Sequence, residues 1–470
     1  MNKATSYVLR THILFALVAL IFGFVFIKIT PPLWGADEGQ HFFRAYQISQ
    51  GKLLQTKVNI GGETSYGGSV PASFVSLDKL KTEDILNVIP GETQQVDNLS
   101  AYKKIANTPA NQDKQVANPY GKIIYSPIVY IAPSLGMAIG GVFDSTPLSL
   151  LFAARIATLF LYMTLVFCSL YILRKTVIKW IIFAVALLPM SLYQASVVSA
   201  DSLLLGLSFI FFAILYVTLF EKEKLGRKEI GLITLLGALL TLVKVPYIFL
   251  VFLLAFLPLP IHVSDRKKLF IRVGIPLICL IIALLSVISI RGVGGAAAPQ
   301  PNISLGGQLH WVIAHPFIYA YILINSISVL DWVPQIVGLF GSSFVLIPGI
   351  LSQALLVLLV MLAFIETKKN DDKSGNGLVF AGIVYLISSI LAALAIVTIL
   401  YLSWTPVGGN LVQGIQGRYF LPIVAFILLG VRMLTRARLY FSQKTLAIVC
   451  TSAMSGSLLF ATLWYIKILY

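Results

Sequence analysis

Residues 13–49 read ILFALVALIFGFVFIKITPPLWGADEGQHFFRAYQIS, an apolar run followed at once by a dense polar segment. The run at residues 13–30 is close to the ~20 residues that a helix needs to cross a hydrocarbon core. Its basic upstream flank is also typical of a signal peptide. It has no small-residue cleavage site, however, and it runs into Pro31-Pro32. We therefore interpret it as an uncleaved first span.

The composition of the whole chain indicates a membrane protein. Of its 470 residues, 58% are hydrophobic and 11% are charged, and the mean hydropathy is +0.88. Soluble domains carry roughly 25% charged residues, so a large soluble protein with buried helices is excluded. The net charge of +16 would suggest nucleic acid in a soluble protein. Here the basic residues fall in short loops between apolar runs, where they set membrane orientation, so no nucleic-acid partner is predicted.

Apolar runs recur along the chain and predict one all-α polytopic membrane domain over residues 1–470 with about eleven transmembrane helices. The predicted spans are residues 13–30, 148–173, 176–195, 201–220, 229–243, 245–262, 270–290, 346–366, 377–402, 418–434 and 445–467. With the N-terminus inside, the six inner segments hold 20 of the 35 lysines and arginines. This asymmetry predicts a cytoplasmic N-terminus and an outer Tyr470.

Two outer regions are expected between the spans. Residues 31–147 form a large first outer loop with juxtamembrane helices, and residues 291–345 form a second outer region. The apolar stretch at 123–143 contains two prolines and several glycines, and counting it as a span would invert every later loop. We interpret it as a helix on the outer surface, and residues 310–330 in the same way.

The three cysteines, Cys168, Cys279 and Cys450, all lie inside apolar runs. They show neither disulfide pairing nor metal-ligand spacing, so no metal site is predicted from them.

The ionisable residues near the predicted bilayer gather at one level. Charges there are costly and are usually retained for a function. With the spans oriented as above, eight of them lie at the outer interface, and Gln416 and Tyr419 lie beside Arg418. These are Asp37, Glu38, His41, Arg44, Arg155, Asp201, Lys244 and Arg418. Their convergence is the main functional signal in the sequence.

Each of these residues also has a structural interpretation. Asp37 and Glu38 could complement the dipole of a following helix. His41 and Arg44 could then pair with these two carboxylates. Arg155, Lys244 and Arg418 could extend to the headgroups, and Asp201 could cap a helix. Gly414 and Gly417, beside Arg418, would let the backbone approach a ligand closely.

Several blocks of the sequence are familiar. The runs ADEGQHFFRAYQISQGKL, SVVSADSLLLG, LVKVPY and QGRYFLP resemble a family of predicted bacterial membrane proteins, domain of unknown function 2142. That family in turn looks like the GT-C glycosyltransferases, which use polyprenyl-phosphate sugars. The shared pattern is an acidic residue just after the first span, a Pro-Tyr surface helix and an AAR-type span. Here these correspond to Asp37-Glu38, SPIVYIAPSLG and FAARIATLFLY.

The resemblance implies a GT-C-like architecture and an inverting sugar transferase of the bacterial plasma membrane. The donor would be a polyprenyl-phosphate sugar, and the acceptor a glycan or glycolipid at the outer face. A carboxylate would take the proton of the acceptor hydroxyl, and cations would stabilise the leaving lipid phosphate. Asp37 is favoured as the base because the resemblance places the acidic residue there, with Glu38 as the alternative. Arg418, Lys244 or Arg155 would bind the phosphate, and His41, Arg44, Asp201, Gln416 and Tyr419 would line the substrate site.

Other functions remain open at this stage. The residues require no cofactor, and they leave open whether a divalent cation assists. A lipid-linked substrate transporter or flippase would also be basic and many-spanned, but it should show repeats and charges at the bilayer midplane. A polysaccharide polymerase or ligase would share the outer arginines without needing a carboxylate directly after the first span.

Overall fold

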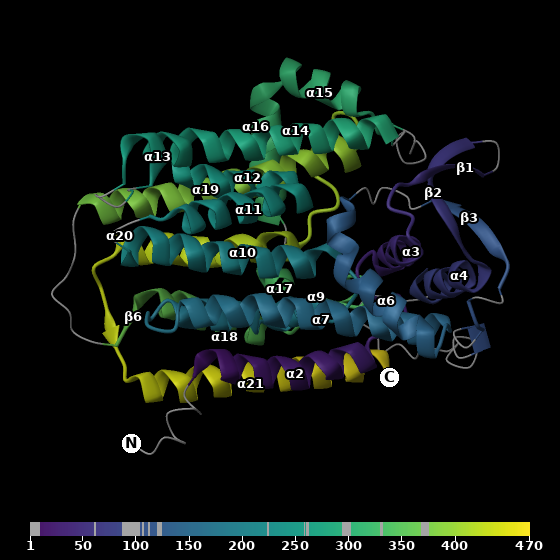
Figure 1. The fold of residues 1–470 in the computed structure, drawn as a ribbon, viewed down its shortest axis with the longest axis horizontal. Helices are drawn as coiled ribbons and strands as arrows, with labels where there is room; N and C mark the ends of the chain where they lie inside the picture. The colour runs from purple at the N-terminus through teal and green to yellow at the C-terminus, as the bar shows by residue number, and fades with distance from the viewer. Residues whose placement is uncertain are drawn as a thin grey trace.

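The computed structural model describes residues 10–60, 63–86, 104–105, 108–110, 113–119, 125–222, 225–257, 259, 263–293, 302–329, 332–367 and 376–470. Most of these residues are helical, and the long helices run side by side in one bundle (Figure 1). The prediction of an all-α polytopic membrane protein is confirmed.

Seven predicted spans are helices long and apolar enough to cross a membrane, among the residues that the structure describes. They are α2 (Thr11–Ile29), α7 (Pro147–Ile172), α10 with η2 (Ala200–Glu221), α13 to α14 (Asp265–Ser286 of Asp265–Val293), α19 (Gly377–Trp404 of Asn376–Trp404), η5 with α20 (Gly417–Leu434) and α21 (Gln443–Leu469). The expected count of eleven is not confirmed.

The other four predicted spans are short or broken helices. Residues 176–195 form α8 (Lys179–Ala186) and α9 (Pro189–Ala195), because Pro189 starts a new helix. The remaining three correspond to α11 (Arg227–Val243), α12 (Ile248–Phe256) and α18 (Gly349–Phe364), of 17, 9 and 16 residues. At 1.5 Å per residue, none of these reaches ~30 Å, the thickness of a hydrocarbon core.

The two segments excluded from the span count are also short helices. Residues 127–143 form η1 (Pro127–Tyr130) and α6 (Ile131–Phe143), which packs along the first half of α7. Gly136 permits this contact, because a Cβ there would lie 2.4 Å from the Ala153 carbonyl oxygen. In the second outer region, α15 (Leu305–Ala314) and α16 (Pro316–Val329) are bent by 109° where Pro316 follows His315. Counted as one broken span, they would make an eighth candidate.

The polar stretch after α3 (Glu38–Ser49) forms a small unit that we call the cap. It comprises β1 (Thr56–Ile60), β2 (Glu63–Pro71), α4 (Ala72–Leu86) and β3 (Gln115–Pro119), with the strands antiparallel in the order β1-β2-β3. Phe74 of α4 packs against Phe42 of α3 with ring centroids 4.7 Å apart. Figure 1 shows α3, α6 and the cap together at one end of the bundle.

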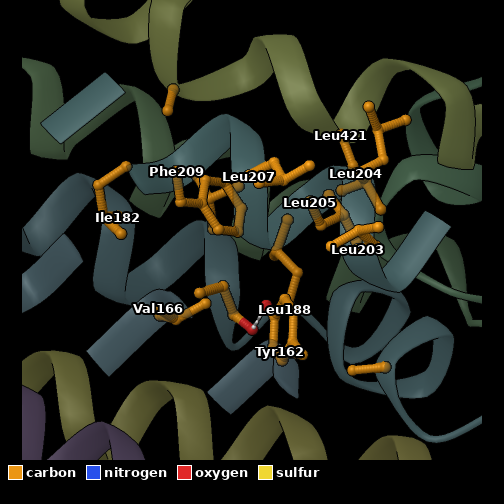
Figure 2. Close-up of a cluster of buried hydrophobic side chains, with 14 of the residues drawn as sticks. Tyr162, Val166, Ile182, Leu188, Leu203, Leu204, Leu205, Leu207, Phe209 and Leu421 are labelled. Carbon is orange, nitrogen blue, oxygen red and sulfur yellow. Dashed lines mark hydrogen bonds between the residues drawn. The ribbon is translucent and has the colours of Figure 1, made fainter. Parts of the chain in front are cut away.

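The bundle core lies where α7, α8 and α10 meet. Tyr162, Val166, Ile182 and Phe209 are among its buried side chains, and the Tyr162 hydroxyl donates to the Ala186 carbonyl at 2.8 Å (Figure 2). This packing fixes the ends of α7 and α10, which carry two of the predicted site residues.

The first and last helices are neighbours. α21 runs beside α2, and the Tyr470 hydroxyl donates to the Ile29 carbonyl at 3.0 Å, so the chain ends near the cap. α2 begins at Thr11 at the opposite end of the bundle (Figure 1). Which end faces the cytoplasm stays a prediction from the loop charges.

Candidate functional site

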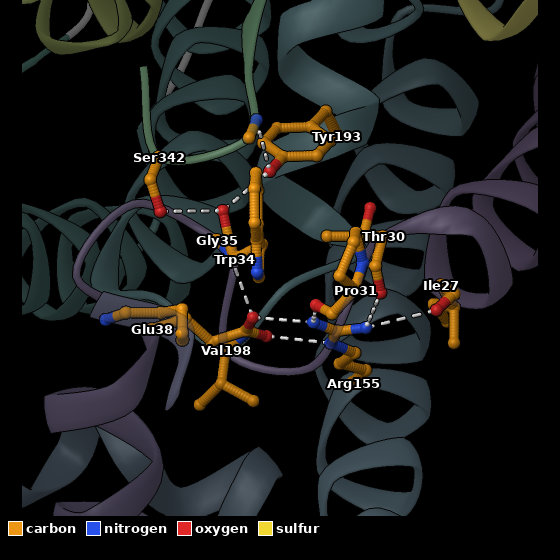
Figure 3. Close-up of polar contacts among 12 residues, drawn as sticks. Ile27, Thr30, Pro31, Trp34, Gly35, Glu38, Arg155, Tyr193, Val198 and Ser342 are labelled. Carbon is orange, nitrogen blue, oxygen red and sulfur yellow. Dashed lines mark hydrogen bonds and ion pairs between the residues drawn. The ribbon is translucent and has the colours of Figure 1, made fainter. Parts of the chain in front are cut away.

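Glu38 and Arg155 form a fully buried ion pair, with side chains 0% and 1% exposed. Arg155 Nε donates to Glu38 Oε1 at 2.8 Å and Nη2 donates to Oε2 at 2.6 Å, so the contact is bidentate (Figure 3). Glu38 also accepts the backbone N–H groups of Gly35 and Val198 at 2.9 and 3.0 Å. One carboxylate thus joins α3, α7 and the segment before α10.

Arg155 uses its remaining donors on the end of α2. Its Nη1 donates to the carbonyls of Ile27 and Thr30, and Nη2 donates to the carbonyl of Pro31, at 2.8 to 3.1 Å. These contacts satisfy orphan carbonyls at a helix C-terminus. All three guanidinium nitrogens are engaged with protein, which leaves neither partner of the pair facing a ligand. Arg155 therefore does not extend to the headgroups.

The loop between α2 and α3 is anchored from two further elements. The Trp34 carbonyl accepts hydrogen bonds from the Tyr193 hydroxyl at 3.2 Å and from Ser342 Oγ at 3.1 Å (Figure 3). The Tyr193 hydroxyl in turn accepts the Gly341 N–H at 3.0 Å. These contacts hold rigid the segment that presents Asp37.

Asp37 differs from its neighbour in both backbone and surroundings. It precedes α3 in the left-handed region, with φ +59°, a conformation that Asp tolerates better than most residues. Its side chain is 55% exposed and contacts Arg418 Nη2 at 2.8 Å. Of the two predicted carboxylates, Asp37 is the one accessible to a substrate.

Arg418 is the centre of a group of charges from four elements. It is 4% exposed, and besides Asp37 it contacts Asp201 Oδ2 at 3.2 Å and Gln416 Oε1 at 2.6 Å. Asp201 is shared, since its Oδ1 also accepts from Lys244 Nζ at 2.6 Å. We call Asp37, His41, Asp201, Lys244 and Arg418 the ionic cluster. Residues 381 positions apart in the chain meet there.

Aromatic rings surround the cations of the ionic cluster. Lys244 Nζ lies 4.7 Å from the ring centroid of Tyr419 and 6.0 Å from that of Tyr125. Tyr125 stacks on His41 with centroids 5.5 Å apart, and His41 Nδ1 lies 3.0 Å from the Tyr130 hydroxyl. The result is a partly desolvated site in which electrostatic interactions are stronger than in water.

The ionic cluster sets the protonation of its members outside the spans. Partial desolvation by the surrounding protein opposes ionisation of Asp37, but Arg418 and His41 outweigh it and lower the pKa of that carboxyl. Burial lowers the pKa of His41 to about 4, although Asp37 and Asp201 oppose the shift. Burial disfavours the charged form of Lys244 too, yet Asp201 raises its pKa above the usual value. At neutral pH the site holds two carboxylates, two cations and a neutral imidazole.

Two interpretations of single residues need correction, and a third gains a second physical reason. Arg44 does not pair with Asp37 or Glu38; its guanidinium donates to the carbonyls of Lys52 and Leu53 and to Gln47. Gly417 packs closely against α17 (Trp332–Val337), since a Cβ there would lie 2.4 Å from the Ile336 backbone nitrogen, and its approach to a ligand stays a prediction. Asp201 does not cap α10; it lies within the helix and binds Lys244 and Arg418.

The sequence prediction missed two of the three tyrosines that surround the ionic cluster. Tyr125 and Tyr130 bracket His41, and neither was among the predicted site residues. The feature that could have identified them is their position at the start of the Pro-Tyr surface helix, where residues 125–130 include two tyrosines. In the described ranges, no group of three or more His, Cys, Asp or Glu side chains is placed to hold a metal ion.

The fold and the ionic cluster define a polytopic α-helical membrane protein with a group of contacting charged residues at the cap end of its bundle. Within that class, the chain belongs to the family of predicted membrane proteins DUF2142, which it matches over residues 20–427. The family predicted from the sequence is confirmed. No curated protein and no solved structure matches the chain. The likeness to GT-C enzymes stays a prediction.

Proposed function

We propose that the protein is a membrane glycosyltransferase that moves a sugar from a polyprenyl-phosphate donor to a glycan or glycolipid at the outer face of the plasma membrane. The observation that carries the proposal is the contact between half-exposed Asp37 and buried Arg418, beside Lys244. A carboxylate and two cations lie together at the cap end of the bundle, which is the combination of groups that this reaction needs.

The reaction needs one proton acceptor and a stabilised leaving group. The acceptor hydroxyl attacks the anomeric carbon, and Asp37 takes its proton as the new glycosidic bond forms. The bond from the anomeric carbon to the phosphate oxygen breaks, and its electron pair stays on the lipid phosphate. Arg418 and Lys244 stabilise that charge, and attack from the side opposite the phosphate inverts the anomeric centre.

The ligand-free contacts suggest how the donor enters. Asp201 is buried and held by both cations, whereas Asp37 is exposed and held by Arg418. A donor phosphate would therefore replace Asp37, and not Asp201, on the guanidinium. Release from Arg418 removes the charge that lowers the pKa of Asp37, which makes its carboxylate a stronger base when substrate is present.

The geometry gives Glu38 and Arg155 a supporting role in this proposal. Their hydrogen-bonding groups are directed at each other and at backbone atoms. We therefore assign the base to Asp37 alone and phosphate binding to Arg418 and Lys244, with Tyr419, Tyr125 and His41 lining the site.

A test is donor turnover by purified protein with a panel of polyprenyl-phosphate hexoses and pentoses, followed as release of polyprenyl phosphate. Asp37→Asn keeps the side-chain size and removes the proton acceptor, so we expect turnover to fall by about 10²–10⁴. The matched control is Asp144→Asn, an exposed carboxylate at the same end that binds the Thr146 N–H. Wild-type turnover by Asp37→Asn would remove the centre of the proposal. Movement of the intact lipid-linked sugar between the two leaflets of a vesicle, without release of polyprenyl phosphate, would instead favour a flippase.

A further inference from the structure

A second charged site lies at the other end of the bundle, away from the cap. A cavity of about 400 Å³ opens where α2 begins, beside the turn between α7 and α8. Its volume is within the range of small-molecule sites. Its lining residues are Arg10, Thr11, His12, Tyr171, Arg174, Lys175 and Lys179.

The charge of this cavity is of one sign. Four of the seven lining residues are Arg or Lys, and none is acidic. Arg174 lies over the Tyr171 ring at 4.1 Å and donates to the Tyr171 carbonyl, so it is held at the cavity wall. Lys179 is buried and donates to the Arg174 carbonyl at 3.1 Å. Like charges held together in this way favour an anion that neutralises them.

Two buried polar atoms of residues that line the cavity lack partners within the described part of the chain. His12 is 6% exposed and its Nδ1 has no hydrogen bond, although its ring packs edge-on against Phe167 and Tyr171. Thr11 is 3% exposed and its Oγ1 is also unpartnered. Unsatisfied buried groups are rare in native proteins, and a ligand is one explanation for them.

The backbone at the start of α2 also favours an anion in this cavity. Thr11 is the first residue of α2, so the positive end of the helix dipole is at the cavity. Helix N-termini bind phosphate through this field and through their free N–H groups. The basic side chains and the helix dipole therefore both select a compact anion.

We propose that this cavity binds a phosphate group, supplied either by an anionic phospholipid headgroup or by free phosphate. Basic pockets between membrane helices are suited to lipid headgroups, and the exposed position of Arg174 and Lys175 leaves the site open. The proposal is independent of sugar transfer, because the cavity and the ionic cluster lie at opposite ends of the bundle.

The experiment measures thermal stability and saturable binding of the full-length protein in a neutral detergent. Phosphatidylglycerol, inorganic phosphate and phosphatidylcholine are titrated separately. Arg174→Gln/Lys175→Gln removes two exposed charges from the cavity, and His12→Phe removes the ring nitrogen while keeping the edge-on packing. The control is Arg266→Gln/Arg436→Gln, which removes two exposed charges outside the cavity, one in α13 and one between α20 and α21.

We expect saturable binding of phosphatidylglycerol or of inorganic phosphate, and the one that binds identifies the source. Arg174→Gln/Lys175→Gln should weaken it by about tenfold or more, since each hydrogen bond to a charged group contributes on that order. His12→Phe should weaken it without lowering the melting temperature of the ligand-free protein. Equal loss in the control variant, unchanged binding in both cavity variants, or no saturable binding of either phosphate probe would each overturn the proposal.

Discussion

Asp37 and Glu38 are adjacent carboxylates with opposite surroundings. Glu38 points into the bundle and is saturated by Arg155 and two backbone N–H groups, whereas Asp37 points to the surface beside Arg418. The left-handed backbone at Asp37 produces this divergence, because it turns the chain just before α3 begins. Separate functions can therefore be assigned to two residues that the sequence alone left interchangeable.

Replacing Glu38 should damage the fold and not merely the reaction. Glu38→Gln leaves Arg155 buried without a counter-charge, and breaking a buried pair in this way costs about 3–5 kcal/mol. Asp37→Asn removes a half-exposed contact and should cost less than about 1 kcal/mol. Thermal unfolding of the two variants in the same detergent measures the difference. Equal melting temperatures would show that the Glu38–Arg155 pair is not a main support of the bundle.

Arg418 should not tolerate lysine. Its Nε, Nη1 and Nη2 contact Gln416, Asp201 and Asp37, three partners in different directions. An ammonium is a point charge without this planar fork. We expect Arg418→Lys to lose donor binding and turnover about as far as Arg418→Ala, measured on folded protein. Near-normal turnover by the lysine variant would remove Arg418 from phosphate binding and shift that role to Lys244.

The convergence of these residues was predictable, but their pairing was not. Threading by loop charge placed Asp37, Asp201, Lys244 and Arg418 at one interface, and the structure brings them into contact. Which carboxylate meets which cation depends on side-chain packing between segments far apart in the chain. Hydropathy carries no information on that packing, so it could not separate Arg155, whose donors bind Glu38 and backbone carbonyls, from Arg418 and Lys244.

At the scale of elements, the site depends on how closely η5 approaches α17. The Gly417 N–H donates to Gln335 Oε1 at 3.1 Å, and a Cβ on Gly417 would meet the α17 backbone. This contact positions Arg418, the next residue. Apolar length predicted the helices well, whereas the breaks at Pro189 and Pro316 shortened or bent two of them.

Gly417→Ala should therefore displace Arg418 and destabilise the protein. Overpacking against backbone, which cannot rotate away, costs typically ~1–3 kcal/mol. We expect a lower melting temperature and weaker donor binding. Gly349→Ala is the matched control, because a Cβ there meets nothing within 4 Å. Identical melting curves for the two variants would show that η5 can shift without consequence.

At the scale of the whole molecule, the bundle places α2's first residue and Tyr470 at opposite ends, with the cap beside Tyr470. Such an arrangement fits an odd number of crossings. The count of eleven is not confirmed, since short helices such as α12 have the same apolar composition as the long candidate spans.

The orientation predicts a labelling pattern in intact cells. In a background without Cys168, Cys279 and Cys450, an impermeant thiol reagent should label Lys57→Cys in the cap. It should not label Arg436→Cys, which lies between α20 and α21. Both side chains are exposed in the fold, so accessibility within the protein does not separate them. The reverse pattern would invert the topology and remove the proposed outer-face site.

The separation of Glu38 from Arg155 by 117 positions has a consequence for biosynthesis. Ribosomes add about 5–20 residues per second, so Glu38 emerges on the order of ten seconds before its partner exists. During that interval α2 and α3 cannot be joined to α7 through this ion pair. The Glu38 carboxylate must therefore stay hydrated or be shielded by the insertion machinery. A nascent chain that stalls before α7 is complete would expose an unneutralised carboxylate beside the bilayer.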